Sequence, residues 1–256
     1  MRKVILTEKG NGIYELKINR PEKHNAIDFE TIEELKKHIE YINDHPHRIR
    51  AVVITGEGER AFCSGGDIKA FHDLKTKEEA FKMLSSMGEV LYKVMTLPIP
   101  TFALLGGMAL GGGCEIATAC DIRLAKADIE MGFIQGNLAI TTGWGGATML
   151  FEKLAYDKAL LLLTSANKFT TEDGIRQGFI HEVFQQETFR QDAYQFIENS
   201  LVKHPSVLGA YKKVKIKEWV QKGLKEKMIA EIDQCAELWV SEEHHKAVDS
   251  FINRIK

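Results

Sequence analysis

The chain has 256 residues, of which 44% are hydrophobic and 27% are charged, and this composition is ordinary for a globular protein. This length predicts one α/β domain, or a core domain that carries a smaller helical appendage. The formal net charge of −2 gives no long-range field that would attract nucleic acid or an anionic membrane surface. We therefore expect neither nucleic acid nor a membrane as a partner.

The sequence suggests neither membrane insertion nor metal binding. It contains no run of about 20 apolar residues that would span a bilayer. Glu8 comes too early for a secretory signal, which favours a cytoplasmic protein. The four cysteines form no C-x-x-C pair and no histidine pair has a zinc-finger spacing, so we expect no metal site. Cys114 and Cys120 lie in an apolar, glycine-rich stretch and are expected to pack in the core.

The first hundred residues alternate short apolar runs with helical patterns. Residues 14–18 alternate with period two and predict a strand, and the β-branched run 51–55 predicts a buried strand. Asp28 is placed to cap a helix, and a second helical pattern over 77–95 ends before two prolines. The apolar residues of the first helix recur at spacings of three and four: Ile32, Leu35, Ile39 and Ile42.

The middle of the chain continues this alternation. Residues 101–105 predict another buried strand, residues 106–113 a glycine-dense turn, and the residues from there through Cys120 a helix. Strands separated by helices of this length predict an α/β architecture with crossover connections.

The C-terminal part, from about residue 188, has helical and strongly charged patterns throughout. The basic run 212–217 is followed closely by acidic residues, so we expect a solvated helix face there rather than a nucleic-acid patch. The adjacent His244 and His245 lie on a charged helix and are expected to face solvent.

Two glycine-bearing turns are the first candidates for chemistry. Residues 61–69 read Ala-Phe-Cys-Ser-Gly-Gly-Asp-Ile-Lys, and residues 111–115 read Gly-Gly-Gly-Cys-Glu. Glycines at such turns let the backbone aim N–H groups, with a helix dipole behind them, at a developing negative charge. The second turn lacks the last glycine of G-x-G-x-x-G, and Gly-Lys-Ser/Thr follows neither turn, which argues against nucleotide phosphates. The patterns favour an oxyanion hole, with simple tight turns as the alternative.

Glu115 stands in the first turn of the helix that follows the second glycine turn. A carboxylate there could be an ordinary helix-start charge that the helix dipole stabilises. Its apolar neighbours Leu110, Cys114, Ile116 and Ala117 nevertheless predict burial. A buried acid needs a partner or a chemical task, so we favour a catalytic role for Glu115.

The stretch from Ala109 to Asp121, Ala-Leu-Gly-Gly-Gly-Cys-Glu-Ile-Ala-x-x-Cys-Asp, resembles the central motif of the crotonase (enoyl-CoA hydratase/isomerase) family. Three further motifs agree with this family in order and spacing: Asn-Arg-Pro-Glu-Lys-His-Asn-Ala over 19–26, the turn from Cys63 to Lys69, and Gly-Trp-Gly-Gly over 143–146. A C-terminal helical region agrees as well. The resemblance covers the chain from about residue 4 to its end.

The resemblance implies a fold and an assembly. The fold would be an α/β spiral of repeated β-β-α turns followed by helices. The crotonase core would cover residues 1–187, and a C-terminal helical region over residues 188–256 would serve in oligomerisation and cover the active site. The implied assembly is a homotrimer or a dimer of trimers.

The resemblance also implies roles for individual residues. The backbone N–H groups of Gly66 and Gly112 would form the oxyanion hole, and Glu115 matches the first of the two catalytic glutamates of enoyl-CoA hydratases. Asp67 is expected to hold its turn rather than to react. Coenzyme A is part of the acyl-CoA substrate, so no separate cofactor is implied. The positions expected at the coenzyme A site are Lys23, His24, Ser64, Gly66, Asp67, Ile68 and Lys69.

The resemblance breaks at Gln135, twenty residues after Glu115. Hydratases carry their second catalytic glutamate there, within Phe-Gly-x-Pro-Glu, whereas this chain has Met-Gly-Phe-Ile-Gln over 131–135. Glutamine can orient a water molecule but cannot gain or lose a proton near neutral pH. Since one positioned acid–base group contributes about 10²–10⁴ in rate, hydration requires Glu115 to act as both base and acid. Gln135 is then either a water-positioning residue or a vestige.

Three functions remain open. The first is an enoyl-CoA hydratase-type lyase with Glu115 as its single acid and base. The second is a decarboxylase of methylmalonyl- or ethylmalonyl-CoA, because the Trp144-Gly145-Gly146 stretch resembles the ethylmalonyl-CoA decarboxylase branch; Trp144 is a candidate pocket residue that could equally fill core volume. The third is a non-catalytic acyl-CoA-binding subunit, which the intact Glu115 disfavours. A double-bond isomerase is disfavoured because several isomerase branches retain the second acid.

Overall fold

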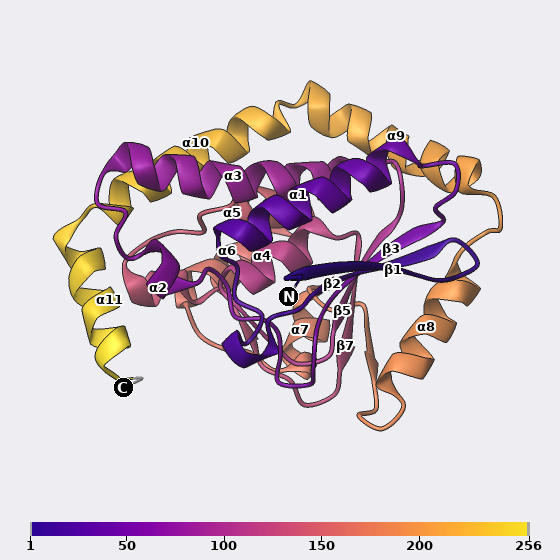
Figure 1. Ribbon diagram of the computed structural model, residues 1–256, viewed down its shortest axis with the longest axis horizontal. Coiled ribbons are helices and arrows are strands. Elements are labelled where there is room, and N and C mark those ends of the chain that lie inside the picture. The colour runs from indigo at the N-terminus through magenta and orange to yellow at the C-terminus, as the bar shows by residue number, and fades with distance from the viewer. Residues whose placement is uncertain (1, 255–256) are drawn as a thin grey trace.

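The computed structural model describes residues 2–254, and these form two sheets enclosed by helices (Figure 1). The larger sheet has the strand order β1-β2-β3-β5-β7-β9 and the smaller sheet the order β4-β6-β8. The strands are β1 (Val4–Gly10), β2 (Ile13–Ile18), β3 (Ala51–Gly56), β4 (Ala61–Cys63), β5 (Thr101–Leu105), β6 (Met108–Leu110), β7 (Ile122–Lys126), β8 (Met131–Gly132) and β9 (Glu182–Phe184). Only the β1–β2 pair, a hairpin, is antiparallel among these strands.

Successive turns of the chain add one strand to each sheet. The chain passes from β3 to β4, from β5 to β6 and from β7 to β8, and helical segments return it to the larger sheet. Parallel neighbours require such crossover connections, because a tight hairpin can join only antiparallel strands. The predicted α/β spiral of β-β-α turns is therefore confirmed.

The helices surround this spiral. They are α1 (Phe29–Asp44), α2 (Ile68–Phe71), α3 (Lys77–Thr96), α4 (Gly112–Ala119), α5 (Gly146–Phe151), α6 (Tyr156–Ser165), α7 (Thr171–Gln177), α8 (Phe189–Ser200), α9 (Pro205–Gln221), α10 (Leu224–Trp239) and α11 (Glu242–Arg254), with 3₁₀ turns η1 (Pro21–Lys23) and η2 (Ile134–Leu138). Asp28 caps α1 as predicted, since its carboxylate accepts the Thr31 N–H. Thr76 and Glu79 form a capping box that starts α3.

The glycine-dense segment 106–113 is not a single turn. It contains the short strand β6, and α4 already begins at Gly112. All eight residues of α4 are buried, so the helix runs through the centre of the molecule between the two sheets and the outer helices. Burial on every side erases the amphipathic pattern that would mark its start in the sequence.

The C-terminal helices lie on two sides of the spiral (Figure 1). Helix α8 covers one face of the larger sheet, where Phe189 and Ile197 pack against Val53 and Phe102. Helix α10 lies along α3 and α5, and α11 turns down at the far end of the molecule beside η2. None of the helices within residues 2–254 combines the length and apolar composition that crossing a bilayer requires.

The expectation that His244 and His245 face solvent was wrong. His244 is only 3% exposed, and its Nδ1 lies 2.7 Å from the Leu138 carbonyl oxygen, because α11 folds back onto η2. His245 is half-buried beside it. In the basic run 212–217, Lys213 and Lys217 are exposed as expected, whereas Lys212 is largely buried: its Nζ forms a 2.7 Å ion pair with Asp121 and donates to the Ile99 carbonyl at 2.8 Å.

Candidate active site

A pocket of about 720 Å³ opens beside the N-terminal end of α4. Its walls come from the two glycine turns, η2, the segment 140–144 and α11. Such a concave and largely apolar site is typical of small-molecule binding. The pocket brings together seven of the residues named from the sequence: Ser64, Gly66, Ile68, Gly112, Glu115, Gln135 and Trp144.

The backbone N–H of Gly66 is directed away from Ile27, whose backbone pairs with this turn in an isolated parallel bridge. The Gly65 carbonyl accepts the Ile27 N–H at 2.8 Å, and the Asp67 N–H donates to the Ile27 carbonyl at 2.8 Å. The Gly65 carbonyl and the Gly66 N–H belong to one trans peptide group, so they point in opposite directions. The Gly66 N–H therefore points away from Ile27.

The backbone N–H of Gly112 is the first of helix α4 and has no partner within that helix. The Gly111 carbonyl in the same peptide group accepts the Cys114 N–H along the helix, so the Gly112 N–H points outward from the helix start. A Cβ on Gly65 would lie 3.1 Å from the Gly112 nitrogen, which places the two turns side by side. Two N–H donors from separate turns thus border one pocket.

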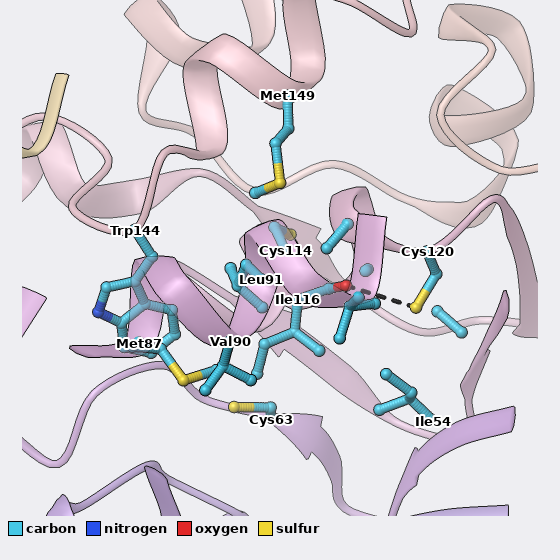
Figure 2. Packing of buried hydrophobic residues seen from close by; sticks show 14 of the residues in the cluster. Ile54, Cys63, Met87, Val90, Leu91, Cys114, Ile116, Cys120, Trp144 and Met149 are labelled. Atoms are coloured by element: carbon cyan, nitrogen blue, oxygen red, sulfur yellow. Dashed lines mark hydrogen bonds between the residues drawn. The ribbon is translucent and has the colours of Figure 1, made fainter. Parts of the chain in front are cut away.

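Trp144 packs its indole against both of these glycines. A Cβ on Gly112 would lie 2.1 Å from indole Cζ3, and a Cβ on Gly66 would lie 3.7 Å from indole Cζ2. The side chain is 4% exposed and belongs to the same buried cluster as Met87, Cys114 and Ile116 (Figure 2). Trp144 therefore fills core volume and lines the pocket at once.

The Glu115 carboxylate is buried and held mainly by backbone donors. Its Oε2 accepts the N–H groups of Trp144 at 2.8 Å and Gly146 at 2.9 Å, and its Oε1 accepts the Gly143 N–H at 3.3 Å. The side-chain amide of Gln135 donates to Oε1 at 2.9 Å. Gly146 has no side chain because a Cβ there would lie 2.5 Å from Glu115 Cγ.

Burial is the main reason that the pKa of Glu115 rises from 4.5 to about 7. The nearby Glu231 carboxylate raises this pKa further, whereas the backbone donors from residues 143–146 lower it. Near neutral pH the group is thus present both as a carboxylate and as a carboxylic acid. A pKa close to the working pH suits a residue that both accepts and donates a proton.

Gln135 stands on η2 with its amide directed at Glu115. While Nε2 donates to Glu115, the amide oxygen Oε1 is buried and has no hydrogen-bond partner among the described residues. An acceptor in this position suits a donor from a water molecule or a substrate.

The motif at residues 19–26 supports the first glycine turn. The Arg20 guanidinium pairs with Asp67 at 2.9 Å and with Asp28 at 3.1 Å. The Asn25 amide donates to the carbonyls of Glu57 and Ala61, and its oxygen accepts the Arg20 N–H at 3.0 Å. Asp67 thus anchors the turn from behind, through an ion pair that faces away from the pocket.

Besides Asp67, three residues expected at the coenzyme A site do not line this pocket. Lys23 and His24 are exposed on and after η1, and the His24 carbonyl accepts the Ser64 N–H at 3.1 Å. Lys69 is exposed and borders a smaller hollow together with His72 and Asp249. These side chains lie around the outside of the site rather than within it.

Sequence reasoning missed the helical walls of the pocket. Met83 and Leu84 come from α3, Trp239 from α10, and Val248 and Phe251 from α11. The apolar spacing of these helices was a visible signal, but the sequence does not say which pocket an apolar helix face borders.

Metal and thiol chemistry find little support in the described structure. Within residues 2–254 no cluster of three histidine, cysteine or acidic side chains is arranged to hold a metal ion. Cys63 and Cys120 are fully buried, and burial raises the pKa of each thiol to about 12, which suppresses the reactive thiolate.

Comparisons with known proteins agree on one family. The sequence model of the enoyl-CoA hydratase/isomerase family matches residues 8–256. A short-chain-enoyl-CoA hydratase from Clostridium acetobutylicum is 29% identical over 253 residues, which is 98% of this chain and 95% of that protein. An ethylmalonyl-CoA decarboxylase from Xenopus tropicalis is 32% identical over 222 residues, which is 86% of this chain and 73% of that protein. The crystal structure of an enoyl-CoA hydratase from Bacillus halodurans has the same fold, with a TM-score of 0.88 at 22% identity over 97% of this chain and 99% of that one.

Proposed function

The chain belongs to the enoyl-CoA hydratase/isomerase family, and from this premise we propose that it is a lyase that adds water to the double bond of an enoyl-CoA thioester. The observation that carries the proposal is the buried Glu115, with a pKa of about 7, in a pocket bordered by the N–H groups of Gly66 and Gly112. Hydration needs one group that moves a proton and one site that stabilises an enolate. This pocket offers both.

The two glycine N–H groups are proposed to bind the thioester carbonyl oxygen. As water adds to C3, negative charge moves from the double bond onto that oxygen and produces an enolate. Donors that are already in place stabilise the charge without reorganisation, and loss of one such donor typically costs about 10²–10³ in rate.

A single acid suffices for the proton transfers. The Glu115 carboxylate takes a proton from the water whose oxygen bonds to C3, and the resulting carboxylic acid gives that proton to C2. Every proton and electron pair is then accounted for, and Glu115 returns to its starting state. Gln135 is proposed to orient the water, because its free Oε1 can accept the hydrogen that is not transferred.

The coenzyme A portion is proposed to extend along Ser64, Gly66 and Ile68 toward Lys23, His24 and Lys69, whose cationic or polar side chains suit phosphate groups. Asp67 lies behind this path and is proposed to support it. Coenzyme A is part of the substrate, so no separate cofactor is invoked. We further propose a cytoplasmic homotrimer or dimer of trimers, with residues 1–187 as the core; Tyr211 and Val214 of the C-terminal helices are 77% and 73% exposed, which suits burial in an assembly.

A decarboxylase of methylmalonyl- or ethylmalonyl-CoA is a second candidate. Gln135 in place of a second acid and the Trp-Gly-Gly motif over 144–146 favour it, as does the 32% identity to the decarboxylase from Xenopus tropicalis. Breaking the bond between C2 and the carboxylate releases carbon dioxide and leaves the electron pair in a thioester enolate, whose oxygen the same two N–H groups would bind. Glu115 in its acid form would then protonate C2.

The pH dependence of the rate distinguishes the two reactions. Hydration starts from the Glu115 carboxylate, so kcat/KM for crotonyl-CoA should fall as the pH drops through about 7. Decarboxylation ends with protonation by the acid form, so its rate should instead fall as the pH rises through about 7. Both assays are run on purified protein, following loss of enoyl absorbance in one and carbon dioxide release in the other.

Glu115→Gln should lower the hydration rate by about 10²-fold or more, and Glu226→Gln on the exposed side of α10 serves as the matched control. Decarboxylation that exceeds hydration and declines above pH 7 would establish the second candidate. Failure of wild-type protein in both assays would contradict both candidates and leave the non-catalytic acyl-CoA-binding subunit.

A further inference from the structure

The segment from Thr142 to Thr148 lies between two carboxylates, that of the buried Glu115 and that of the half-buried Glu231. On one side, the N–H groups of residues 143, 144 and 146 donate to Glu115. On the other side, the Thr142 hydroxyl donates to Glu231 at 2.5 Å, and the N–H groups of Ala147 and Thr148 donate to Glu231 at 3.0 and 2.7 Å. The Ala147 N–H also contacts the Thr142 hydroxyl oxygen at 3.0 Å, which closes the network.

The two carboxylates together satisfy the first turn of α5. The N–H groups at a helix start have no partners within the helix, and carboxylates are stabilised at that end. Here Glu115 takes the first of them, at Gly146, and Glu231 takes the next two. A shift of either carboxylate therefore moves the donors that hold the other.

Glu231 has no cation to neutralise it. No lysine, arginine or histidine among residues 2–254 forms an ion pair with it; the neighbouring Lys227 pairs with Glu152, and Lys77 pairs with Asp233. The titratable groups that interact with Glu231 are the Glu115 carboxyl and the Cys235 thiol. Burial raises the pKa of Glu231, against the effect of its hydrogen bonds.

An unpaired buried carboxylate is unfavourable for folding unless its hydrogen bonds are complete. A glutamine at this position of α10 would avoid that penalty and could still accept from Thr142 and Ala147 through its amide oxygen, so these hydrogen bonds alone do not require a charged group. The Glu231 carboxylate instead raises the pKa of Glu115, second only to burial as a cause. Neither Glu231 nor Thr142 lines the pocket, so neither can touch a substrate there.

We propose that Glu231, acting through Thr142 and the first turn of α5, is a positioning residue that holds the Glu115 carboxyl ready for proton transfer. The C-terminal helix α10 thereby contributes to catalysis from outside the pocket. The kinetic consequence rests on the proposed function, whereas the coupling between the two carboxylates does not.

The coupling is tested by carboxyl ¹³C NMR on protein labelled at glutamate, with the Glu115 signal assigned from its absence in Glu115→Gln. In Glu231→Gln the pKa of Glu115 should fall by at least about 0.5, because a neighbouring negative charge is removed. Asp233→Asn, two residues further along the same helix and paired with Lys77, should leave this pKa unchanged.

The kinetic consequence is tested on the same variants with crotonyl-CoA. Glu231→Gln should lower kcat about tenfold with KM within twofold, and should move the acid limb of the pH profile to lower pH. Thr142→Val, which keeps the side-chain volume but removes the hydroxyl, should lower kcat similarly, and Thr142→Ser should restore it. If Glu231→Gln does not fold, the comparison of kcat between Thr142→Val and Thr142→Ser tests the kinetic consequence instead.

The outcomes separate this inference from the proposed function. If Glu231→Gln lowers the pKa of Glu115 but the wild-type protein does not hydrate crotonyl-CoA, the proposed function is overturned and the coupling between the two carboxylates stands. An unchanged pKa together with unchanged kcat in Glu231→Gln, or equal kcat in Thr142→Val and Thr142→Ser, would overturn the inference while active wild-type protein keeps the proposed function.

Discussion

Gly112 illustrates how one missing side chain defines the site. Its backbone conformation is ordinary for a helix start. Glycine is therefore needed here because a Cβ would clash with a neighbour, and not because the backbone has a positive φ. The space is taken by the Trp144 indole, which lies where a Cβ would be. The ring also reaches Gly66, so a single side chain sets the distance between the two turns that carry the proposed oxyanion donors.

Gly112→Ala should therefore act through Trp144. We expect it to destabilise the protein by about 1–3 kcal/mol, because the added methyl group overpacks the core, and to lower kcat by about 10²-fold as the donor shifts. In a Trp144→Ala background the same methyl group should cost less than about 0.5 kcal/mol. Urea unfolding of wild type, Gly112→Ala, Trp144→Ala and the double variant measures the coupling between the two positions. If the changes in the free energy of unfolding are fully additive, the indole does not have the role given to it here.

At the scale of elements, helix α4 carries Gly112 and Glu115 at its start, and its far end must be stabilised within the protein. That end is buried, so its free carbonyls require donors other than bulk water. Lys153, in the turn after α5, supplies them: its Nζ donates to the carbonyls of Thr118, Ala119 and Cys120 at 2.6, 3.2 and 2.6 Å. Burial lowers the pKa of this lysine to about 7, but the amine keeps hydrogen-bond donors in either protonation state.

Lys153→Met should leave the Thr118 and Ala119 carbonyls without this donor, whereas the Cys120 carbonyl keeps the Arg123 guanidinium at 2.9 Å. The expected loss is about 1–3 kcal/mol in the free energy of unfolding, measured in urea at pH 8. Lys246→Met removes an exposed lysine that is paired within α11 and should change stability by less than about 0.5 kcal/mol. Equal effects of the two substitutions would show that the end of α4 does not depend on Lys153.

For the whole molecule, the buried acids make stability depend on pH. The pKa of Glu115 is about 7 in the folded state and near 4.5 in the unfolded chain, so between these values the folded state binds more protons. Stability therefore falls as pH rises through this window. Glu231, whose pKa is also raised, acts in the same direction, while burial lowers the pKa of His181 to about 4 and opposes both.

The difference between wild type and Glu115→Gln isolates the contribution of Glu115. Below pH 4.5 the two proteins should differ little, because the carboxyl is neutral in both states. Toward pH 8 the variant should gain up to about 3 kcal/mol relative to wild type, the equivalent of the pKa difference. Thermal unfolding at pH 5, 6, 7 and 8 measures this gain, and a constant difference across the series would contradict the raised pKa.

Local sequence signals were sufficient for much of the fold. Alternation predicted β2, β-branched runs predicted β3 and β5, and capping residues and apolar spacing predicted α1 and α3. These features depend on residues near one another in the chain, so they can be recognised without the tertiary structure. The short strands of the smaller sheet were not predicted, because their two or three residues acquire a strand conformation only from partners far away in the sequence.

The sequence by itself determined the family, the spiral fold and the residue types of the site, because these depend on motifs with fixed spacing: the two glycine turns, the early helical glutamate, and a glutamine where a second acid is expected. Only the tertiary structure decided how the acid is tuned. Burial and the distant Glu231 raise the pKa of Glu115, and Trp144 joins the two turns. The tertiary structure also buries His244, because α11 folds back over η2. Electrostatics and packing depend on distance in space, and the chain order does not contain those distances.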